Sequence, residues 1–332
     1  MEKIKIGLTY DLRDEYLKMG FSEEETAEFD KEDTIIGIEN ALIELGYQTE
    51  RIGNIKNLVS ELSIGKKWDI VFNICEGLYG IGRESQVPCL LDAFNIPYVF
   101  SDPLVLALSL HKGMIKKVLR YYNIPTPDFF VVKNITDVEK INLEFPLFAK
   151  PVAEGTGKGI TDKSLINNKQ ELIEVCSYLL EKFHQPVLIE KYLSGREFTV
   201  GIIGTGENAR CVGVMEIVLN SKAEKNVYSY TNKDQYLDRV TYNIIEGKIA
   251  RECEKVALDA WIAIGAEDGG RVDVRYDSAG IANFVEVNPL AGLNPTHSDL
   301  CIMSRIQGYS YSQLIGWIME SAIKKIRKCK KL

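Results

Sequence analysis

The residues of this chain whose types and spacing best suit chemistry lie in its last third, in two short triplets. Arg271-Val272-Asp273 and Glu286-Val287-Asn288 each place polar side chains on either side of a valine. On a β-strand, residues i and i+2 share a face, so Glu286 and Asn288 should point together while Val287 packs the other way. Two neighbouring strands of this kind would bring three oxygen ligands and a guanidinium to one place.

This set of groups suits reactions of phosphate. Magnesium prefers carboxylate and carbonyl oxygens together with substrate phosphates, which makes Asp273, Glu286 and Asn288 candidate metal ligands. Arginine stabilises charge that develops on oxygen, which makes Arg271 a candidate catalytic residue. The alternative is a strand with one wet face. The turn at residues 288–295 (NPLAGLNP) favours chemistry, because such a turn holds the end of the strand rigidly.

A glycine-rich segment in the middle of the chain is the second candidate site. The run from Glu154 to Gly159 (EGTGKG) follows an expected strand, and its glycines let backbone amides turn toward an anion. It does not fit a Walker A loop, and an ordinary tight turn is the alternative. Lys150, just upstream, either serves a phosphate or extends its charge from the sheet edge into water. An adenine pocket needs hydrogen-bonding groups with apolar flanks, a combination offered by Glu190, Lys191, Tyr192, Leu193 and Glu197.

The sequence around these residues predicts strands that alternate with helices. Strands are expected over residues 4–10, 68–74, 146–151, 187–191 and 197–203, and helices over 34–45, 87–94 and 112–122. Asp33 is expected to cap the first helix, and the acidic residues 11–33 to form a loop. The alternation predicts an α/β protein with a parallel sheet covered on both faces. The polar, tyrosine-rich residues 221–243 are expected to form a lid.

Composition excludes several classes of function. A chain of 332 residues suggests two or three domains, and a net charge of −7 argues against nucleic acid as the main partner. No apolar run is long enough to span a bilayer, so no membrane association is expected. The seven cysteines show no C-x-x-C pairing, which disfavours a zinc site or a disulfide framework. A cytoplasmic location is therefore expected.

Four sequence blocks, read in order, carry a family resemblance. They are GRESQVP with NIPYVFSD, the segment FPLFAKPVAEGTGKG, the segment VLIEKYLSGREFTV, and the RVD and EVN strands with their glycine turn. Together they resemble the ATP-grasp superfamily and, within it, the D-alanine–D-alanine ligase family. The resemblance implies an ATP-grasp fold of three domains. These would be an N-terminal α/β domain (1–105), a central domain with the phosphate loop (106–190) and a C-terminal domain with the metal site and lid (191–332).

The resemblance also assigns roles by position. It implies that Lys112 and Lys150 contact the phosphates of ATP with the loop residues Glu154, Gly155, Thr156 and Gly157, and that the segment from Glu190 to Glu197 holds adenine and ribose. Asp273, Glu286 and Asn288 would bind two magnesium ions, with manganese as an alternative ion. Arg271 and the amide of Gly292 would stabilise the tetrahedral intermediate. Thr156 and Lys233 take the places of the family's loop serine and lid lysine, with roles in nucleotide binding and catalysis.

The departures from the family pattern lie where the amino-acid substrates would bind. Glu76 replaces a family histidine, and Asp234 replaces the lid tyrosine unless Tyr230 or Tyr236 substitutes for it. Glu28 or Asp30 would supply the carboxylate that receives a substrate ammonium. For the second substrate's carboxylate, the candidates are His297 and Ser298 with their neighbours, although a histidine that merely completes a turn is the alternative. Glu76 and Asp234 together favour a cationic or amine-bearing substrate.

The sequence therefore predicts a magnesium-dependent ligase that joins an amino-acid carboxylate to an amine through an acyl phosphate. D-alanine–D-alanine ligase is the activity that the resemblance favours. A sibling enzyme joining other amino acids or an amine is the nearest alternative, and a non-catalytic ATP-binding sensor or subunit is an alternative of another class. Small-molecule substrates are the expected partners, and a homodimer is expected from the resemblance alone.

Overall fold

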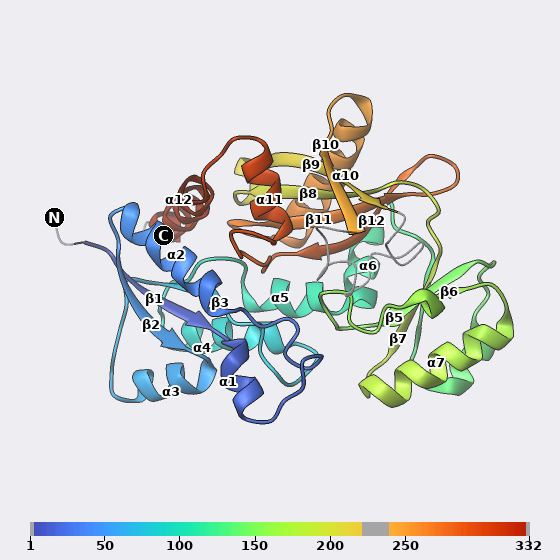
Figure 1. Cartoon of the computed structure of the whole chain (residues 1–332), viewed down its shortest axis with the longest axis horizontal. Helices are drawn as coiled ribbons and strands as arrows, with labels where there is room; N and C mark the ends of the chain where they lie inside the picture. The colour runs from blue at the N-terminus through green and yellow to red at the C-terminus, as the bar shows by residue number, and fades with distance from the viewer. Residues whose placement is uncertain (1–2, 221–238, 330–332) are drawn as a thin grey trace.

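The computed structural model describes residues 3–220 and 239–329, which fold around three β-sheets (Figure 1). Of the expected lid, residues 221–238 lie outside this described part, and with them Lys233, Asp234 and the two candidate tyrosines. The remainder of the expected lid is not a loop, because Val240–Ile244 forms strand β10. The domain bounds expected from the sequence stay a prediction.

The N-terminal sheet is parallel, with strand order β2-β1-β3. Its strands are β1 (Lys5–Tyr10), β2 (Gln48–Gly53) and β3 (Ile70–Ile74). One face packs against helix α2 (Glu32–Glu44), and the other against α3 (Ile55–Ser63) and α4 (Gln86–Ala93). The predicted parallel sheet covered on both faces is therefore confirmed for this region.

Two local predictions near the N-terminus are wrong. Residues 11–33 do not form a simple loop, because helix α1 (Arg13–Lys18) lies within them and Tyr16 packs against Phe29 in the interior. The backbone of Asp30 is also tied to the start of this segment, by hydrogen bonds with Asp11 and Arg13. Lys31, and not Asp33, occupies the N-cap position of α2. Apolar side chains spaced among the acidic ones therefore outweigh the local charge.

The central sheet is antiparallel, with order β4-β7-β5-β6. Its strands are β4 (Phe129–Val132), β5 (Leu147–Pro151), β6 (Leu165–Ile166) and β7 (Val187–Lys191). Helix α7 (Lys169–Phe183) covers one face through a separate apolar cluster. Helices α5 (Pro103–Leu110) and α6 (Lys112–Tyr121) precede this sheet. The predicted strands and the α6 helix are confirmed here to within one residue.

The largest sheet is also antiparallel, with order β10-β9-β8-β11-β12. Besides β10, it contains β8 (Glu197–Ile203), β9 (Arg210–Leu219), β11 (Gly269–Tyr276) and β12 (Ala282–Asn288). Helix α10 (Lys248–Ile264) packs on it, with Trp261 completely buried. Helices α11 (Asp299–Ile306) and α12 (Tyr311–Cys329) follow, and α12 returns to pack on α2 beside the N-terminal sheet (Figure 1).

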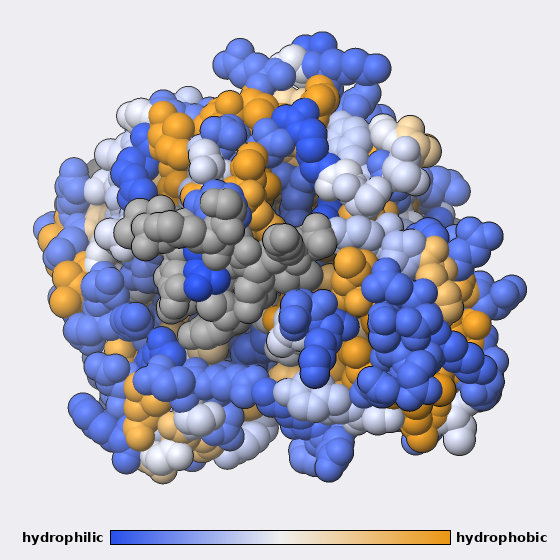
Figure 2. All heavy atoms as spheres, turned by 45° about the vertical axis from the view of Figure 1, so that its right-hand side comes forward, coloured by the Kyte–Doolittle hydropathy of each residue, from blue (hydrophilic) through white to orange (hydrophobic). Residues whose placement is uncertain are grey.

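Short 3-10 helices complete the described structure, at Arg83–Ser85 (η1), Ile135–Lys140 (η2), Asp162–Ser164 (η3) and Gly206–Asn208 (η4). Figure 2 shows one face of the molecule as mainly hydrophilic, with hydrophobic residues in scattered patches. Among the helices of the described residues, none is long and apolar enough to cross a membrane.

Candidate functional site

A pocket lies between the central sheet and the large sheet, and it gathers most of the residues singled out from the sequence. Helix α6 contributes to one side, β5 and the glycine-rich loop to another, and β11 and β12 to the far end. The predicted residues that line it are Lys112, Lys150, Glu154, Gly157, Glu190, Lys191, Tyr192, Leu193, Glu197, Asp273 and Glu286. Residues distant in sequence thus converge on one cavity, as the four sequence blocks require.

A buried carboxylate, Glu190, organises the cationic side of this pocket. One of its oxygens lies 2.9 Å from Lys150 Nζ, and the other lies 2.7 Å from Nζ of Lys116, whose side chain is completely buried. Burial lowers the pKa of Lys116 to about 8, against the opposing effect of Glu190. For Lys150 the attraction of Glu190 and Glu286 outweighs burial, and its pKa is raised. Lys150 is therefore held as a cation that faces the pocket.

Lys116 is a site residue that the sequence analysis missed. It lies four residues after Lys112 on α6, a spacing that places both side chains on one face of a helix. Its Nζ also donates to Thr126 Oγ1 (3.0 Å) and to the carbonyl of Phe284 (3.3 Å). The repeat of lysine at this spacing was the available signal. Glu190 was expected to face adenine, but both of its oxygens are engaged by lysines.

The expected adenine and ribose segment contains an aromatic stack. The rings of Tyr192 and Phe148 are 6.4 Å apart with planes inclined by 25°. The Arg275 guanidinium lies 5.1 Å from the Tyr192 ring centre and 3.2 Å from the Glu197 carboxylate. Lys191 directs its Nζ to the backbone carbonyls of residues 144 and 145. Phe148 and Arg275 both line the pocket and were not selected from the sequence, where neither belongs to a recognisable motif.

The two polar triplets lie on neighbouring antiparallel strands, as predicted. Asp273 is paired in register with Glu286, and Arg271 with Asn288, while both intervening valines are buried. Arg271 donates to the Asp273 carboxylate, which also accepts from the Thr199 hydroxyl. The buried side-chain nitrogen of Asn288 has no hydrogen-bond partner in the described part of the chain. This strand end therefore presents carboxylate and amide oxygens together with a guanidinium.

The glycine-rich loop approaches this strand end from the opposite side. Lys112 Nζ donates to the carbonyl of Glu154 (2.6 Å) and lies 3.7 Å from a carboxylate oxygen of Glu286. Thr156 adopts a left-handed φ of 49°, and among the described residues its buried hydroxyl has no hydrogen-bond partner. Gly159 has a φ of 76°, and a Cβ there would lie 2.6 Å from Pro151, so only glycine fits. The loop is therefore a built structure rather than an ordinary turn.

One loop amide differs from its expected role. Gly155 N donates to Glu28 Oε1 at 2.7 Å and is therefore not available to an anion. Glu28 itself comes from the acidic segment between β1 and α2, so the structure brings this predicted substrate residue to the loop. Burial raises the pKa of the other candidate, Asp30, to about 7, and neighbouring Asp11 and Asp33 act in the same direction.

The remaining substrate candidates are spread over two segments. Glu76 follows β3, and burial together with Glu84, Glu28 and Asp30 raises its pKa well above the usual range. Gly292 and His297 are exposed, and Ser298 Oγ accepts from Asn294 N (2.9 Å).

Asn294 organises the turn that carries these last candidates, and the sequence analysis did not select it. Its side chain is buried and donates to Thr34 of α2 (3.0 Å), while its carbonyl oxygen accepts from Thr296 and His297. The turn after β12 is therefore tied to the N-terminal region.

Comparisons with known proteins agree with this geometry. The family model described as "D-ala D-ala ligase C-terminus" matches residues 118–320. A D-alanine–D-alanine ligase of Bordetella avium is 32% identical over 74% of this chain and 76% of its own length. An uncharacterised protein of Sinorhizobium fredii is 30% identical over 85% of both chains. The crystal structure of the Bacillus anthracis D-alanine–D-alanine ligase complexed with ATP covers 98% of this chain and 99% of its own, with a TM-score of 0.72 and 24% identity.

These matches settle the class of protein. The fold is that of the ATP-grasp ligases, with a parallel N-terminal sheet and two antiparallel sheets, and the predicted fold class is confirmed. The chain belongs to the D-alanine–D-alanine ligase family. The roles expected for individual residues stay predictions.

Proposed function

We propose that the protein is an ATP-dependent carboxylate–amine ligase that joins two D-alanine molecules through an acyl phosphate. The observation that carries this proposal is the pocket between the central and large sheets. Its lysines, its aromatic stack and the Asp273–Glu286 strand pair lie in one cavity of a chain that belongs to this family. Relatives at about 30% identity carry the name D-alanine–D-alanine ligase, and that name supplies the substrates proposed here.

The nucleotide would lie along the pocket. Tyr192, Phe148 and Leu193 offer apolar surface for the base, and Glu197 offers an acceptor for ribose hydroxyls. Lys150 and Lys112 lie toward the glycine-rich loop and Glu286, where the phosphates would be neutralised. Lys116 would act indirectly, because it holds the Glu190 carboxylate that positions Lys150.

The donor set at the end of β11 and β12 fits magnesium. Asp273, Glu286 and Asn288 supply hard oxygen donors on paired strands, and such sites are completed by substrate phosphates. The buried side-chain nitrogen of Asn288 has no hydrogen-bond partner within the described residues, so the fold does not use this amide fully. When bound, the metal would supply charge neutralisation on the phosphates. Manganese offers the same coordination chemistry.

The chain's own residues would then position the reacting groups and stabilise the charge that develops on them. The γ-phosphorus–oxygen bond to ADP breaks as a substrate carboxylate oxygen bonds to phosphorus. The second substrate's amine nitrogen attacks the resulting acyl carbon, inorganic phosphate leaves, and the amine gives up a proton. Arg271, whose side chain is 13% exposed and donates to Asp273, would stabilise the oxyanion of the tetrahedral intermediate. No nucleophilic side chain is needed, because catalysis of this kind relies on positioning and charge.

The test is ADP release with magnesium and ATP across D- and L-amino acids, offered singly and in pairs. Turnover with D-alanine alone supports the proposal directly. Turnover confined to another pair would identify a sibling ligase and contradict the D-alanine assignment. ATP binding without ADP release for any substrate would establish the non-catalytic alternative, in which Arg271 would have no catalytic use.

A further inference from the structure

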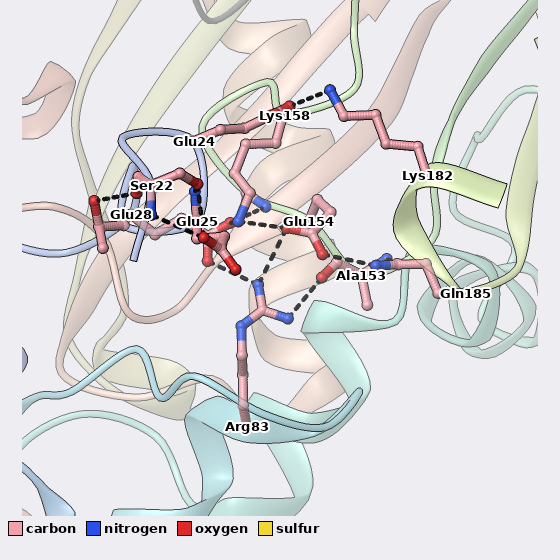
Figure 3. A network of polar contacts seen from close by, with 12 residues as sticks. Ser22, Glu24, Glu25, Glu28, Arg83, Ala153, Glu154, Lys158, Lys182 and Gln185 are labelled. Atoms are coloured by element: carbon pink, nitrogen blue, oxygen red, sulfur yellow. Dashed lines mark hydrogen bonds and ion pairs between the residues drawn. The ribbon is translucent and has the colours of Figure 1, made fainter. Parts of the chain in front are cut away.

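An ionic network joins the N-terminal region to the glycine-rich loop, and Glu28 lies at its centre (Figure 3). Glu28 Oε1 accepts from Gly155 N at 2.7 Å and lies 3.5 Å from Lys158 Nζ. Its Oε2 accepts from Arg83 at 2.7 Å. Only 6% of the Glu28 side chain is exposed, so both oxygens are already engaged by the protein.

Arg83 is held in this position from several sides. It lies in η1, and its second terminal nitrogen donates to the carbonyl of Ala153 at 2.8 Å. A Cβ at Gly77, whose φ is 73°, would lie 2.7 Å from the Arg83 carbonyl oxygen, so the backbone passes close to a glycine here. The Arg83 side chain is 8% exposed. The position of its guanidinium is therefore fixed by the fold.

The charge of Glu28 is compensated without a substrate. Lys158 forms an ion pair with Glu154 at 2.7 Å, and Arg83 lies 3.8 Å from the same carboxylate. Glu28 and Glu154 thus each have a cation as partner, while Glu84 and Glu76 also lie within electrostatic reach of Arg83. Arg83 and Lys158 outweigh the effect of burial and lower the pKa of Glu28 to about 2, so this carboxylate stays ionised. A further cation placed against it would meet a carboxylate whose charge Arg83 and Lys158 already offset.

This balance conflicts with the role that the resemblance implied for Glu28, as the receiver of a substrate ammonium. A carboxylate attracts an ammonium strongly only where its charge is not already neutralised, and burial of an unpaired charge costs several kcal/mol. A hydroxyl in place of the ammonium would carry no such cost, since it needs only a hydrogen bond. The network therefore removes the selection for an amino group at this position.

We propose that Arg83 takes the place of the substrate ammonium at Glu28, so that this ligase activates a 2-hydroxy carboxylate at least as well as the matching 2-amino acid. This proposal rests on the proposed function and specifies the carboxylate substrate of the same site. The reaction is otherwise unchanged. The hydroxy acid's carboxylate receives the γ-phosphoryl group of ATP, an amino acid's amine displaces phosphate, and an amide is the product.

Glu76 is the rival receiver for an ammonium. It lies close to Glu84, Glu28 and Asp30, which raise its pKa together with burial. No ion pair to Glu76 occurs among the described residues. If the ammonium binds there, D-alanine remains the preferred carboxylate substrate despite Arg83, and Glu76→Gln removes that preference.

A competition experiment separates these possibilities. The enzyme receives magnesium, ATP and equal concentrations of D-lactate and D-alanine. Lactyl-alanine is then measured against alanyl-alanine by mass spectrometry after mild alkali, which hydrolyses the ester alanyl-lactate of the same mass and leaves both amides intact. Lactate has no amine and can enter an amide only as the carboxylate component. We expect lactyl-alanine to equal or exceed alanyl-alanine with the wild-type protein. Arg83→Met should shift the ratio toward the dipeptide at least tenfold, because it frees the Glu28 charge, whereas Arg83→Lys should keep the wild-type ratio.

Because both products come from the same enzyme molecules, a partly unfolded variant lowers their sum and leaves their ratio unchanged. Lys169→Met is the matched control, since it removes an exposed ion pair with Glu139 and should leave the ratio unaltered. An excess of dipeptide from the wild type, or a product ratio unchanged in Arg83→Met, overturns the proposal even though the ligase reaction proceeds. Loss of that excess in Glu76→Gln would assign the ammonium to Glu76 instead. Absence of any amide with ATP and every substrate pair would contradict the proposed function itself.

Discussion

The nucleotide pocket and the network around Glu28 are both rich in buried charge, but they distribute it differently. In the pocket, Lys150 and Lys116 share the carboxylate of Glu190, so two lysines meet one acid on the side where the phosphates of a nucleotide would lie. Around Glu28, each of two carboxylates has a cation of its own, because Arg83 pairs with Glu28 and Lys158 with Glu154. A carboxylate that is already paired gains little from a further cation, whereas lysines that share one carboxylate can still accept an anion. The lysine side of the pocket is therefore suited to phosphates, while Glu28 no longer calls for an ammonium.

Both regions draw on the sequence blocks that carry the resemblance. Most of the pocket residues lie in the last three blocks. Arg83 lies in the first, in the GRESQVP segment, and forms contacts that the sequence alone did not reveal. The substitutions below test whether the two regions act as differently as their charges indicate.

The largest effect is expected from Arg271→Met at the reaction centre. Loss of one donor to a developing oxyanion typically lowers kcat by about 10²–10³-fold, so turnover should fall by this amount. Nucleotide affinity, measured by calorimetry with an ATP analogue, should change little because Arg271 does not line the nucleotide pocket. Arg251→Met, exposed on α10, is the control. Turnover within tenfold of the wild type would show that Arg271 holds the Asp273 carboxylate in place and does not stabilise the oxyanion.

Lys116→Met tests the sharing of Glu190 by two lysines. Removal of one partner from a buried ion pair costs about 3 kcal/mol, so the free energy of unfolding in urea should fall by roughly that amount. KM for ATP should rise as well. Without Lys116, Glu190 would pair with Lys150 alone and so hold this lysine more tightly away from the phosphates. Lys116→Arg should restore much of both, and Lys117→Met on the exposed face of α6 should change neither. Unaltered stability in Lys116→Met would mean that Lys150 alone satisfies Glu190.

Much of this arrangement could be predicted from the sequence, because strands and motifs are local patterns. The RVD and EVN triplets fixed strand faces, and the bounds of β7 and β8 were predicted to the residue. Arg83 and Asn294 could not be found in this way, because each acts through a partner more than 50 residues distant in sequence. For Lys116 the local signal was its spacing of four residues from Lys112, but its partner Glu190 is just as distant in sequence. The prediction of a loop over residues 11–33 was wrong for a related reason, since the burial of Tyr16 and Phe29 depends on tertiary packing.

Substitutions in the turn after β12 should lower the free energy of unfolding less than Lys116→Met does. A substitution of buried Asn294 should nevertheless cost more than one of the exposed residues of the turn. Asn294→Ala removes hydrogen bonds to Thr34, Thr296 and His297 from a buried position. Since a buried polar group left without its partner costs about 1–3 kcal/mol, we expect a loss of about 2 kcal/mol in urea unfolding. His297→Ala, at an exposed position of the same turn, should stay within about 0.5 kcal/mol. Equal losses in the two variants would contradict a central role for Asn294.

The smallest expected effect concerns pH and the acidic residues beside Arg83. Burial raises the pKa of Glu84 from 4.5 to about 7, Arg83 opposes this, and Glu28 adds to it. Between these two values the folded protein keeps a proton that the unfolded chain has lost, so stability falls as pH rises through this window. Glu84→Gln should remove that loss. In urea unfolding it should gain more than about 1 kcal/mol over the wild type on going from pH 5 to pH 7.5.

The control for this measurement is Glu246→Gln, at an exposed position outside the network, which should show no such gain. If Glu84→Gln follows the wild type at both pH values, Arg83 and Lys112 compensate Glu84 as fully as Arg83 and Lys158 compensate Glu28. The substrate side would then carry no surplus of negative charge at all, and the contrast with the cationic pocket would be sharper still.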